Sequence, residues 1–163
     1  MNYHELDKED FDAIVTGELT HYSLWLEEEI NDFICDYFRV PLSRFNDFKR
    51  LLLYRDGLTF QDKLEIVRGI VPLLGNAAEA VDLKSLLKQV EDFKSWRNAM
   101  AHGHDVARAE DVAKLKIEII SRSGKQKEIE ITPESHQRMI SEVDVLLEKL
   151  KNARAKLKLR GKA

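Results

Sequence analysis

The sequence predicts a mainly α-helical bundle of about five helices, with a β-hairpin inserted before the C-terminal helix. Gly and Pro are scarce, with 7 and 3 residues, and charged residues make up 34% of the chain, which is the composition of a helical bundle with a charged surface. Apolar residues also recur every three or four positions along most of the chain, the spacing that places them on one face of a helix.

The length of 163 residues is that of one ordinary domain, and a hydrophobic content of 44% is enough to build a core. We therefore expect a single domain over residues 1–163. The only cysteine, Cys35, excludes an intramolecular disulfide and is expected to fill the core. No signal peptide or bilayer-spanning run is visible, which predicts a cytoplasmic protein with no membrane contact.

The net charge of −3 hides an uneven distribution of charge. From Met1 to Asp36 the chain has eleven acids against Lys8 alone, whereas residues 149–163 have seven basic residues and no acid. Such a basic end is able to bind a polyanion. We favour the simpler interpretation of a solvated last helix that frays into a charged end.

Helical periodicity predicts the first two helices. The first extends over about residues 11–38 and stops before Pro41, because the residue before a proline disfavours the α conformation. A shorter helix over about residues 43–54 would follow. It would end at Asp56-Gly57, a dipeptide typical of turns.

The third and fourth helices have clearer ends. Thr59 has the position of an N-cap for the third helix, which Pro72 should bend or end. The fourth helix is predicted over about residues 83–101, with Gly103 just past its end.

Between residues 114 and 132 the apolar period changes from helical to two, which predicts a β-hairpin. Ser123-Gly124-Lys125 would form its turn. Thr132-Pro133-Glu134 then supplies a cap, a proline at the first helical position and an early acid, so the final helix should begin there.

Arg97 interrupts the apolar face of the fourth helix. At about 100° per residue it falls near the middle of an otherwise apolar stripe. The stripe consists of Leu86, Val90, Phe93 and Met100. A guanidinium there is costly unless a carboxylate pairs with it, or unless the face opens onto a cleft or subunit interface where an anion binds. From the stripe alone, a structural pair with Asp62 or Glu65 is the preferred interpretation.

The residues around Arg97 change this preference. The run Trp96-Arg97-Asn98-Ala99-Met100-Ala101-His102-Gly103 resembles the defining motif of the HEPN family, which has an Arg, a polar residue that is often Asn, a few further residues and a His near the end of a helix in an all-α bundle. Residues 48–70 are similar to the helix, turn and helix that commonly precede this motif. The resemblance covers most of residues 11–103, and only the octet is specific.

The resemblance implies a metal-independent endoribonuclease that acts as a homodimer without a cofactor. It makes Arg97 and His102 the catalytic positions and Asn98 the polar residue that orients them. The residue types suit attack by the ribose 2′-OH, because His moves protons near neutral pH and Arg binds phosphate and developing negative charge. The implied partners are RNA, a second copy and an antitoxin or regulator, in a toxin–antitoxin or phage-defence setting.

One geometric point stays open. Residues five apart are separated by about 140° around a regular helix, so Arg97 and His102 should not share a face. Asn98 and His102, four residues apart, nearly share one face of the helix. Either the helix loosens before Gly103, or the pair that acts together comes from different subunits.

Two alternatives compete with the ribonuclease. His102-Gly103-His104-Asp105 contains possible metal ligands, but a further ligand at suitable spacing is missing nearby, so we predict no metal site. The same fold without turnover would be a HEPN-type dimerisation or regulatory module.

Where some HEPN toxins have a Tyr that an antitoxin modifies, this chain has His104, which argues against that mode of neutralisation. His4, His21 and His136 are interpreted as ordinary surface or helix-face residues.

Overall fold

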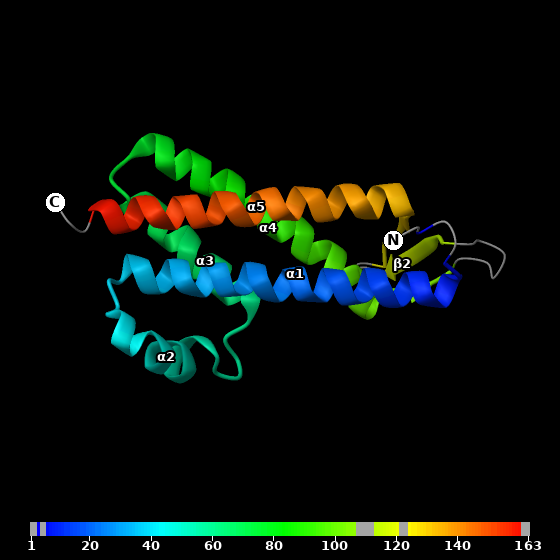
Figure 1. The fold of residues 1–163 in the computed structure, drawn as a ribbon, viewed down its shortest axis with the longest axis horizontal. Coiled ribbons are helices and arrows are strands. Elements are labelled where there is room, and N and C mark those ends of the chain that lie inside the picture. Colours follow the sequence, from blue (N-terminus) through cyan, green and yellow to red (C-terminus); the bar gives the residue numbers. More distant parts are fainter. Residues whose placement is uncertain (1–2, 4–5, 107–112, 121–123, 161–163) are drawn as a thin grey trace. The chain divides into compact units, whose positions relative to one another are not determined.

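The computed structural model describes residues 3, 6–106, 113–120 and 124–160, and these residues are mainly helical (Figure 1). In chain order the elements are α1 (Lys8–Tyr37), η2 (Leu42–Arg44), α2 (Phe45–Phe48), η3 (Lys49–Leu53), α3 (Phe60–Ile70), η4 (Val71–Leu73), α4 (Ala77–His102), β1 (His104–Asp105), β2 (Leu115–Ile120), β3 (Gln126–Ile131) and α5 (Pro133–Arg160). The predicted fold class, a helical bundle with a β-hairpin before the last helix, is confirmed. No described helix is both long enough and apolar enough to cross a bilayer.

The chain forms two compact units. The first, Met1–Ser23 with Asp92–Asp144, contains the three strands and is called the sheet unit here. The second, Leu24–Glu91 with Val145–Ala163, is called the helical unit. Helices α1, α4 and α5 each contribute residues to both units. The expectation of a single domain over residues 1–163 stays a prediction.

Helix α1 lies close to its predicted range, but the second helix, in the helical unit, does not form as one piece. It is divided into the 3-10 turn η2, the four-residue α2 and the π-helical turn η3. The buried side chains of this stretch are those of Lys49 and Leu53. Because so little apolar surface is buried here, tertiary packing does not hold the segment in one regular helix.

The predicted cap and end of the third helix are both confirmed. Thr59 and Asp62 form a capping box, in which the backbone N–H of Thr59 donates to Asp62 Oδ2 at 2.7 Å and the backbone N–H of Asp62 donates to Thr59 Oγ1 at 3.3 Å. At Pro72 the α-helix has given way to the 3-10 turn η4. The missing N–H of proline accounts for this end.

Helix α4 begins at Ala77, six residues before the predicted start at 83. Asn76 caps it, because its Oδ1 accepts a hydrogen bond from the backbone N–H of Glu79 at 3.2 Å. The first turn is rich in alanine, which has the best intrinsic helix propensity, but residues 77–82 are half-buried or exposed. A search for an apolar stripe therefore misses this turn.

The sheet unit contains the predicted hairpin and one further strand. Strands β2 and β3 pair antiparallel with Leu115 opposite Ile131 and Ile117 opposite Ile129, and all four side chains are buried. The predicted turn lies partly outside the described residues, but Gly124 has a φ of 77°, which suits glycine. The two-residue strand β1 pairs with the other edge of β2 and is too short to be seen as a sequence period.

Helix α5 begins at Pro133, as predicted. Thr132 caps it through a hydrogen bond from the backbone N–H of Ser135 to Thr132 Oγ1 at 3.3 Å. For His136, interpreted as a surface or helix-face residue, the surface alternative is wrong, because this side chain is fully buried. It lies between the rings of Tyr3 and Phe11, with centroids 5.7 and 6.2 Å away.

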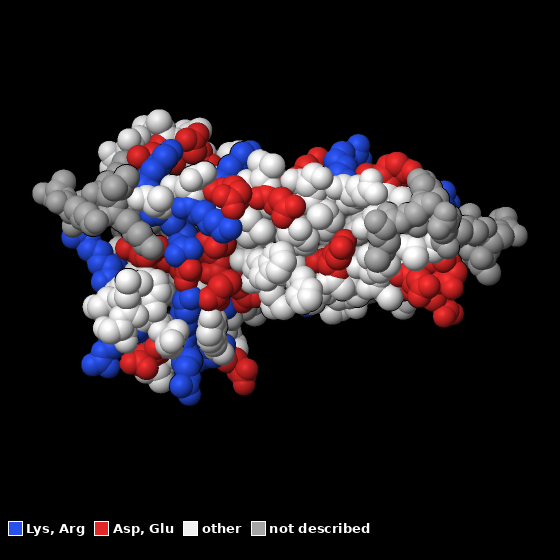
Figure 2. All heavy atoms as spheres, in the orientation of Figure 1, with Lys and Arg blue, Asp and Glu red and all other residues white. Residues whose placement is uncertain are grey.

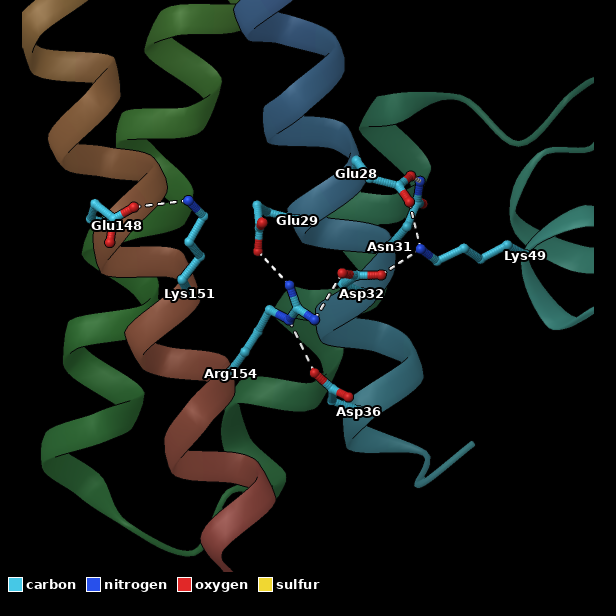
Figure 3. Close-up of polar contacts among 9 residues, drawn as sticks. All are labelled: Glu28, Glu29, Asn31, Asp32, Asp36, Lys49, Glu148, Lys151 and Arg154. Carbon is cyan, nitrogen blue, oxygen red and sulfur yellow. Dashed lines mark hydrogen bonds and ion pairs between the residues drawn. The ribbon is translucent and has the colours of Figure 1, made fainter. Parts of the chain in front are cut away.

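The basic C-terminal segment is helical through Arg160. Figure 3 shows that Arg154 points toward helix α1, where it binds Glu29 at 2.6 Å, Asp32 at 2.8 Å and Asp36 at 3.0 Å. On the face drawn in Figure 2, basic and acidic side chains are intermixed beside the C-terminal part of α5. Arg154 of α5 thus neutralises acids of α1 that lie far from it in the sequence. Cys35 is fully buried, as predicted, and burial raises the pKa of its thiol to about 11.

Candidate functional site

The candidate catalytic residues occupy the last two turns of α4, in the sheet unit. Arg97 and Asn98 are half-buried, and His102, the last residue of the helix, is exposed. Gly103 follows, and the chain then enters strand β1. The Arg97–His102 motif therefore lies at the C-terminal end of α4, next to the short strand β1 of the sheet.

The apolar stripe on which Arg97 was predicted to lie is present. Leu86, Val90 and Phe93 are all buried, and Met100 is half-buried. Ala99, two residues beyond Arg97, is also buried. Arg97 is thus half-buried, and the residues on either side of it along the helix are packed.

The one hydrogen bond that Arg97 makes with another described residue runs from Nη1 to Oδ1 of the neighbouring Asn98, at 3.3 Å. Within the described part of the chain, Arg97 has no carboxylate partner. Asp62 instead caps its own helix, and Glu65 binds Arg68. Among the described residues, no internal acid therefore holds Arg97 in place, and these residues leave donors of its guanidinium unused.

Helix α4 stays regular up to His102. The backbone N–H of Gly103 still donates to the carbonyl of Ala99, at 2.7 Å, which continues the helical pattern. Loosening of the helix before Gly103 is thus not observed. Arg97 and His102 of one chain remain about 140° apart around the helix, while Asn98 and His102, four residues apart, share a face.

Gly103 is required because neighbouring atoms pack closely around it. It does not have a positive φ, so it is not a left-handed helix cap. Instead, a Cβ at this position would overlap the side chain of Ile117 and lie 2.6 Å from the carbonyl oxygen of Ala99. Only glycine lets strand β2 approach the end of α4 this closely, and this packing fixes where His102 leaves the helix.

The two residues after Gly103 take part in the sheet. His104 and Asp105 pair with Glu118 and Ile117 of strand β2. The Asp105 carboxylate binds Lys8 at 2.7 Å and accepts a hydrogen bond from the backbone N–H of Lys116 at 3.4 Å. Across the residues that the structure describes, no group of three or more His, Cys, Asp or Glu side chains is arranged to hold a metal ion.

Two buried polar clusters escaped the sequence analysis. One is the Arg154 cluster of Figure 3, in which the half-buried Asp32 also binds Lys49. The other is His136, whose Nε2 lies 3.1 Å from Glu18 Oε2 without hydrogen-bond geometry. Burial lowers the pKa of His136, and the Glu18 carboxylate partly opposes this shift. The separation of acidic residues near the N-terminus from basic residues near the C-terminus is the sequence signal for the Arg154 cluster, and His136 has no such signal.

The fold and site define a mainly helical protein that presents an Arg-Asn pair and a His at the sheet-bound end of one helix. No protein-family model matches the chain, and comparison with curated proteins and with solved structures finds no significant match.

Proposed function

We propose that this chain is a metal-independent endoribonuclease of the HEPN type, which cleaves RNA by attack of the ribose 2′-OH on the adjacent phosphate. The observation that carries the proposal is the state of Arg97. Its guanidinium is half-buried on a packed helix, bonds to Asn98 and has no carboxylate partner among the described residues. A partly desolvated cation of this kind is suited to a phosphodiester.

The three residues would divide the reaction between them. Arg97 binds a nonbridging phosphate oxygen and stabilises the charge that develops on it. Asn98 holds the guanidinium through its Oδ1. His102, exposed at the helix C-terminus, exchanges protons with solvent and RNA. Attack by the 2′ oxygen breaks the bond to the 5′ oxygen, which leaves with a proton and produces a 2′,3′-cyclic phosphate.

A homodimer supplies what one chain lacks. Because α4 stays regular, Arg97 and His102 of one chain do not share a face. Two copies of this helix facing each other would bring Arg97 of one chain to His102 of the other, and would provide one histidine as base and one as acid. RNA is the proposed substrate. A cytoplasmic setting in toxin–antitoxin or phage-defence systems, with an antitoxin or regulator as a further partner, belongs to the same proposal.

Incubation of purified protein with mixed RNA in excess chelator tests the proposal. We expect cleavage by the parent chain and its loss, by about a hundredfold or more, in both Arg97→Ala and His102→Ala. Arg138→Ala and His21→Ala remove the same residue types from exposed positions on other helices and should cleave normally. Size-exclusion chromatography should show the same dimer for every variant.

Full activity in either Arg97→Ala or His102→Ala would remove the assignment of the site. A chain that forms the dimer but leaves RNA intact would instead be the non-catalytic dimerisation or regulatory module. Activity that depends on an added divalent metal would contradict the metal-independent mechanism.

A further inference from the structure

Residues 38–55 of the helical unit, called the outer segment here, expose a cluster of large apolar side chains. The segment contains η2, α2 and η3. Leu42 is exposed by 80%, Leu51 by 67% and Leu52 by 50%, and Phe38 and Tyr54 are exposed by half or more. Among the described residues, five of the twelve exposed large apolar side chains therefore lie in this short stretch. Apolar side chains gathered in this way are typical of an interaction surface.

The buried side of the outer segment is partly polar. Lys49 is exposed by only 8%, and it binds Glu28 and Asp32 of α1. The hydroxyl of Tyr54 also donates to Glu28 Oε2, at 2.8 Å. Within residues 38–55, all of which the structure describes, Leu53 is the buried apolar side chain. The segment thus turns a cation inward and leucines outward, which gives up hydrophobic stabilisation that a partner covering the leucines would restore.

Basic side chains alternate with the exposed apolar ones. The outer segment has five basic residues and one acid, although the whole chain has a net charge of −3. Arg39, Arg50 and Arg55 are exposed, and their guanidinium groups have no ion-pair or hydrogen-bond partner among the described residues. On the face drawn in Figure 2, uncharged side chains with basic ones beside them cover the surface at α2. Such a surface complements a partner that is both apolar and acidic.

This chemistry favours a protein helix over other occupants. Leucine side chains neither stack on bases nor bond phosphates, so they would gain little from RNA. A symmetric contact with a second copy would set the same guanidinium groups against each other. The described residues of the segment are helical or irregular and offer no strand edge to an extended peptide. An amphipathic helix with leucine-like anchors and flanking carboxylates matches both the apolar and the basic side chains.

We propose that the outer segment is a docking site for an acidic amphipathic helix of a partner protein. The apolar face of that helix covers Leu51 and Leu52. Its carboxylates bind Arg50 and Arg55. The site does not depend on nuclease activity, since the Arg97 motif belongs to the sheet unit.

Fluorescence anisotropy with a synthetic peptide tests this site in the full chain. The chain carries Arg97→Ala and His102→Ala, so that the result is independent of the proposed nuclease site. The labelled probe has about 18 residues, with leucines at helical spacing and glutamates elsewhere. We expect saturable binding with a Kd below about 0.1 mM. A peptide of the same composition in scrambled order, and one with lysine in place of glutamate, should each bind about tenfold more weakly or worse.

Replacement of the exposed leucines tests the apolar part of the site. Leu51→Ala with Leu52→Ala should weaken binding of the glutamate peptide by about tenfold or more, because the apolar area that the peptide covers is reduced. Leu73→Ala with Val81→Ala is the matched control. These two side chains are 67% and 66% exposed in the same unit but lie outside the segment, so this variant should bind normally. Equal weakening by both pairs would overturn the proposal.

Reversal of charge tests the basic part. Arg50→Glu with Arg55→Glu should weaken the glutamate peptide and strengthen the lysine peptide, an exchange of preference that loss of folding does not produce. Circular dichroism of each variant should match that of the parent, since all the replaced side chains are exposed.

Several other results would contradict the docking site. They are no saturable binding of the glutamate peptide, equal binding of the scrambled peptide, and self-association of the chain that the two leucine replacements abolish. Binding of an RNA oligonucleotide or of anionic lipid vesicles that depends on the same leucines, without binding of the peptide, would also overturn it.

Discussion

Gly103 at the end of helix α4 and Ile117 of strand β2 lie so close together that a methyl group on Gly103 would overlap the isoleucine side chain. The carbonyl oxygens of Ala99 and Glu118 are also within 2.6 and 3.1 Å of that methyl position. Two of these neighbours are backbone atoms, which cannot rotate away. The contact ties the motif helix to the sheet and sets the place of His102.

Replacement of Gly103 by Ala should therefore destabilise the protein. We expect the free energy of unfolding to fall by about 1–3 kcal/mol, because the helix end and the strand must separate to admit the methyl group. The urea midpoint followed by circular dichroism measures this loss.

Gly17→Ala is the matched control for Gly103→Ala. Gly17 lies inside α1, and no atom outside its own helix backbone lies within 4 Å of an added Cβ. This change should leave stability unchanged or raise it by up to about 1 kcal/mol, since alanine is the better helix former. An equally stable Gly103→Ala variant would show that the helix end is not held against β2.

Replacement of Arg154 by Met should be strongly destabilising. The Arg154 side chain is 14% exposed, and its removal would leave Asp36, which is 4% exposed, without this cation. Removal of one partner from such a cluster typically costs about 3 kcal/mol, because the remaining carboxylates stay partly buried without the cation that they share. Lys151→Met, which breaks only a surface pair with Glu148, should leave the thermal midpoint unchanged. Equal midpoints for both variants would contradict the structural role of Arg154.

The buried His136 should make the fold sensitive to acid. Burial lowers its pKa below the ordinary 6.5 despite the opposing Glu18 carboxylate, so at mildly acidic pH the unfolded chain binds more protons than the folded one. The stability that His136 contributes is therefore complete above pH 6.5 and is lost as the pH falls toward its folded pKa.

His136→Phe keeps the aromatic packing against Tyr3 and Phe11 but removes this titration. Its free energy of unfolding should fall less steeply than that of the parent between about pH 7 and pH 5. His21→Gln, a change at an exposed histidine, should keep the parent slope. An unchanged slope in His136→Phe would mean that the buried imidazole does not titrate differently on folding.

The parts of the fold that could be predicted from the sequence are those set by local signals. Thr59 and Pro133 mark helix starts through chemistry that acts within one turn. The alternation from Leu115 to Ile131 reflects burial of one sheet face. Strand β1 and the true role of Gly103 could not be predicted, because both depend on β2, more than ten residues further along the chain.

The same distinction holds for polar residues. The position of Arg97 on a packed helix face follows from periodicity, but the absence of a carboxylate beside it among the described residues depends on the whole fold. Likewise, the pairing of Arg154 with Glu29 joins residues 125 positions apart, and the burial of His136 depends on Tyr3 and Phe11. No local pattern carries such information.

Analysis of the products of RNA cleavage distinguishes attack by the ribose 2′-OH from other mechanisms. An RNA oligonucleotide and its 2′-deoxy counterpart are each incubated with the parent chain in excess chelator, and the product ends are identified by mass spectrometry. We expect RNA fragments that end in a 2′,3′-cyclic phosphate, no cleavage of the deoxy strand and no product from Arg97→Ala or His102→Ala. Intact RNA, cleavage of the deoxy strand, or fragments with 5′-phosphate and 3′-hydroxyl ends would contradict attack by the 2′-OH.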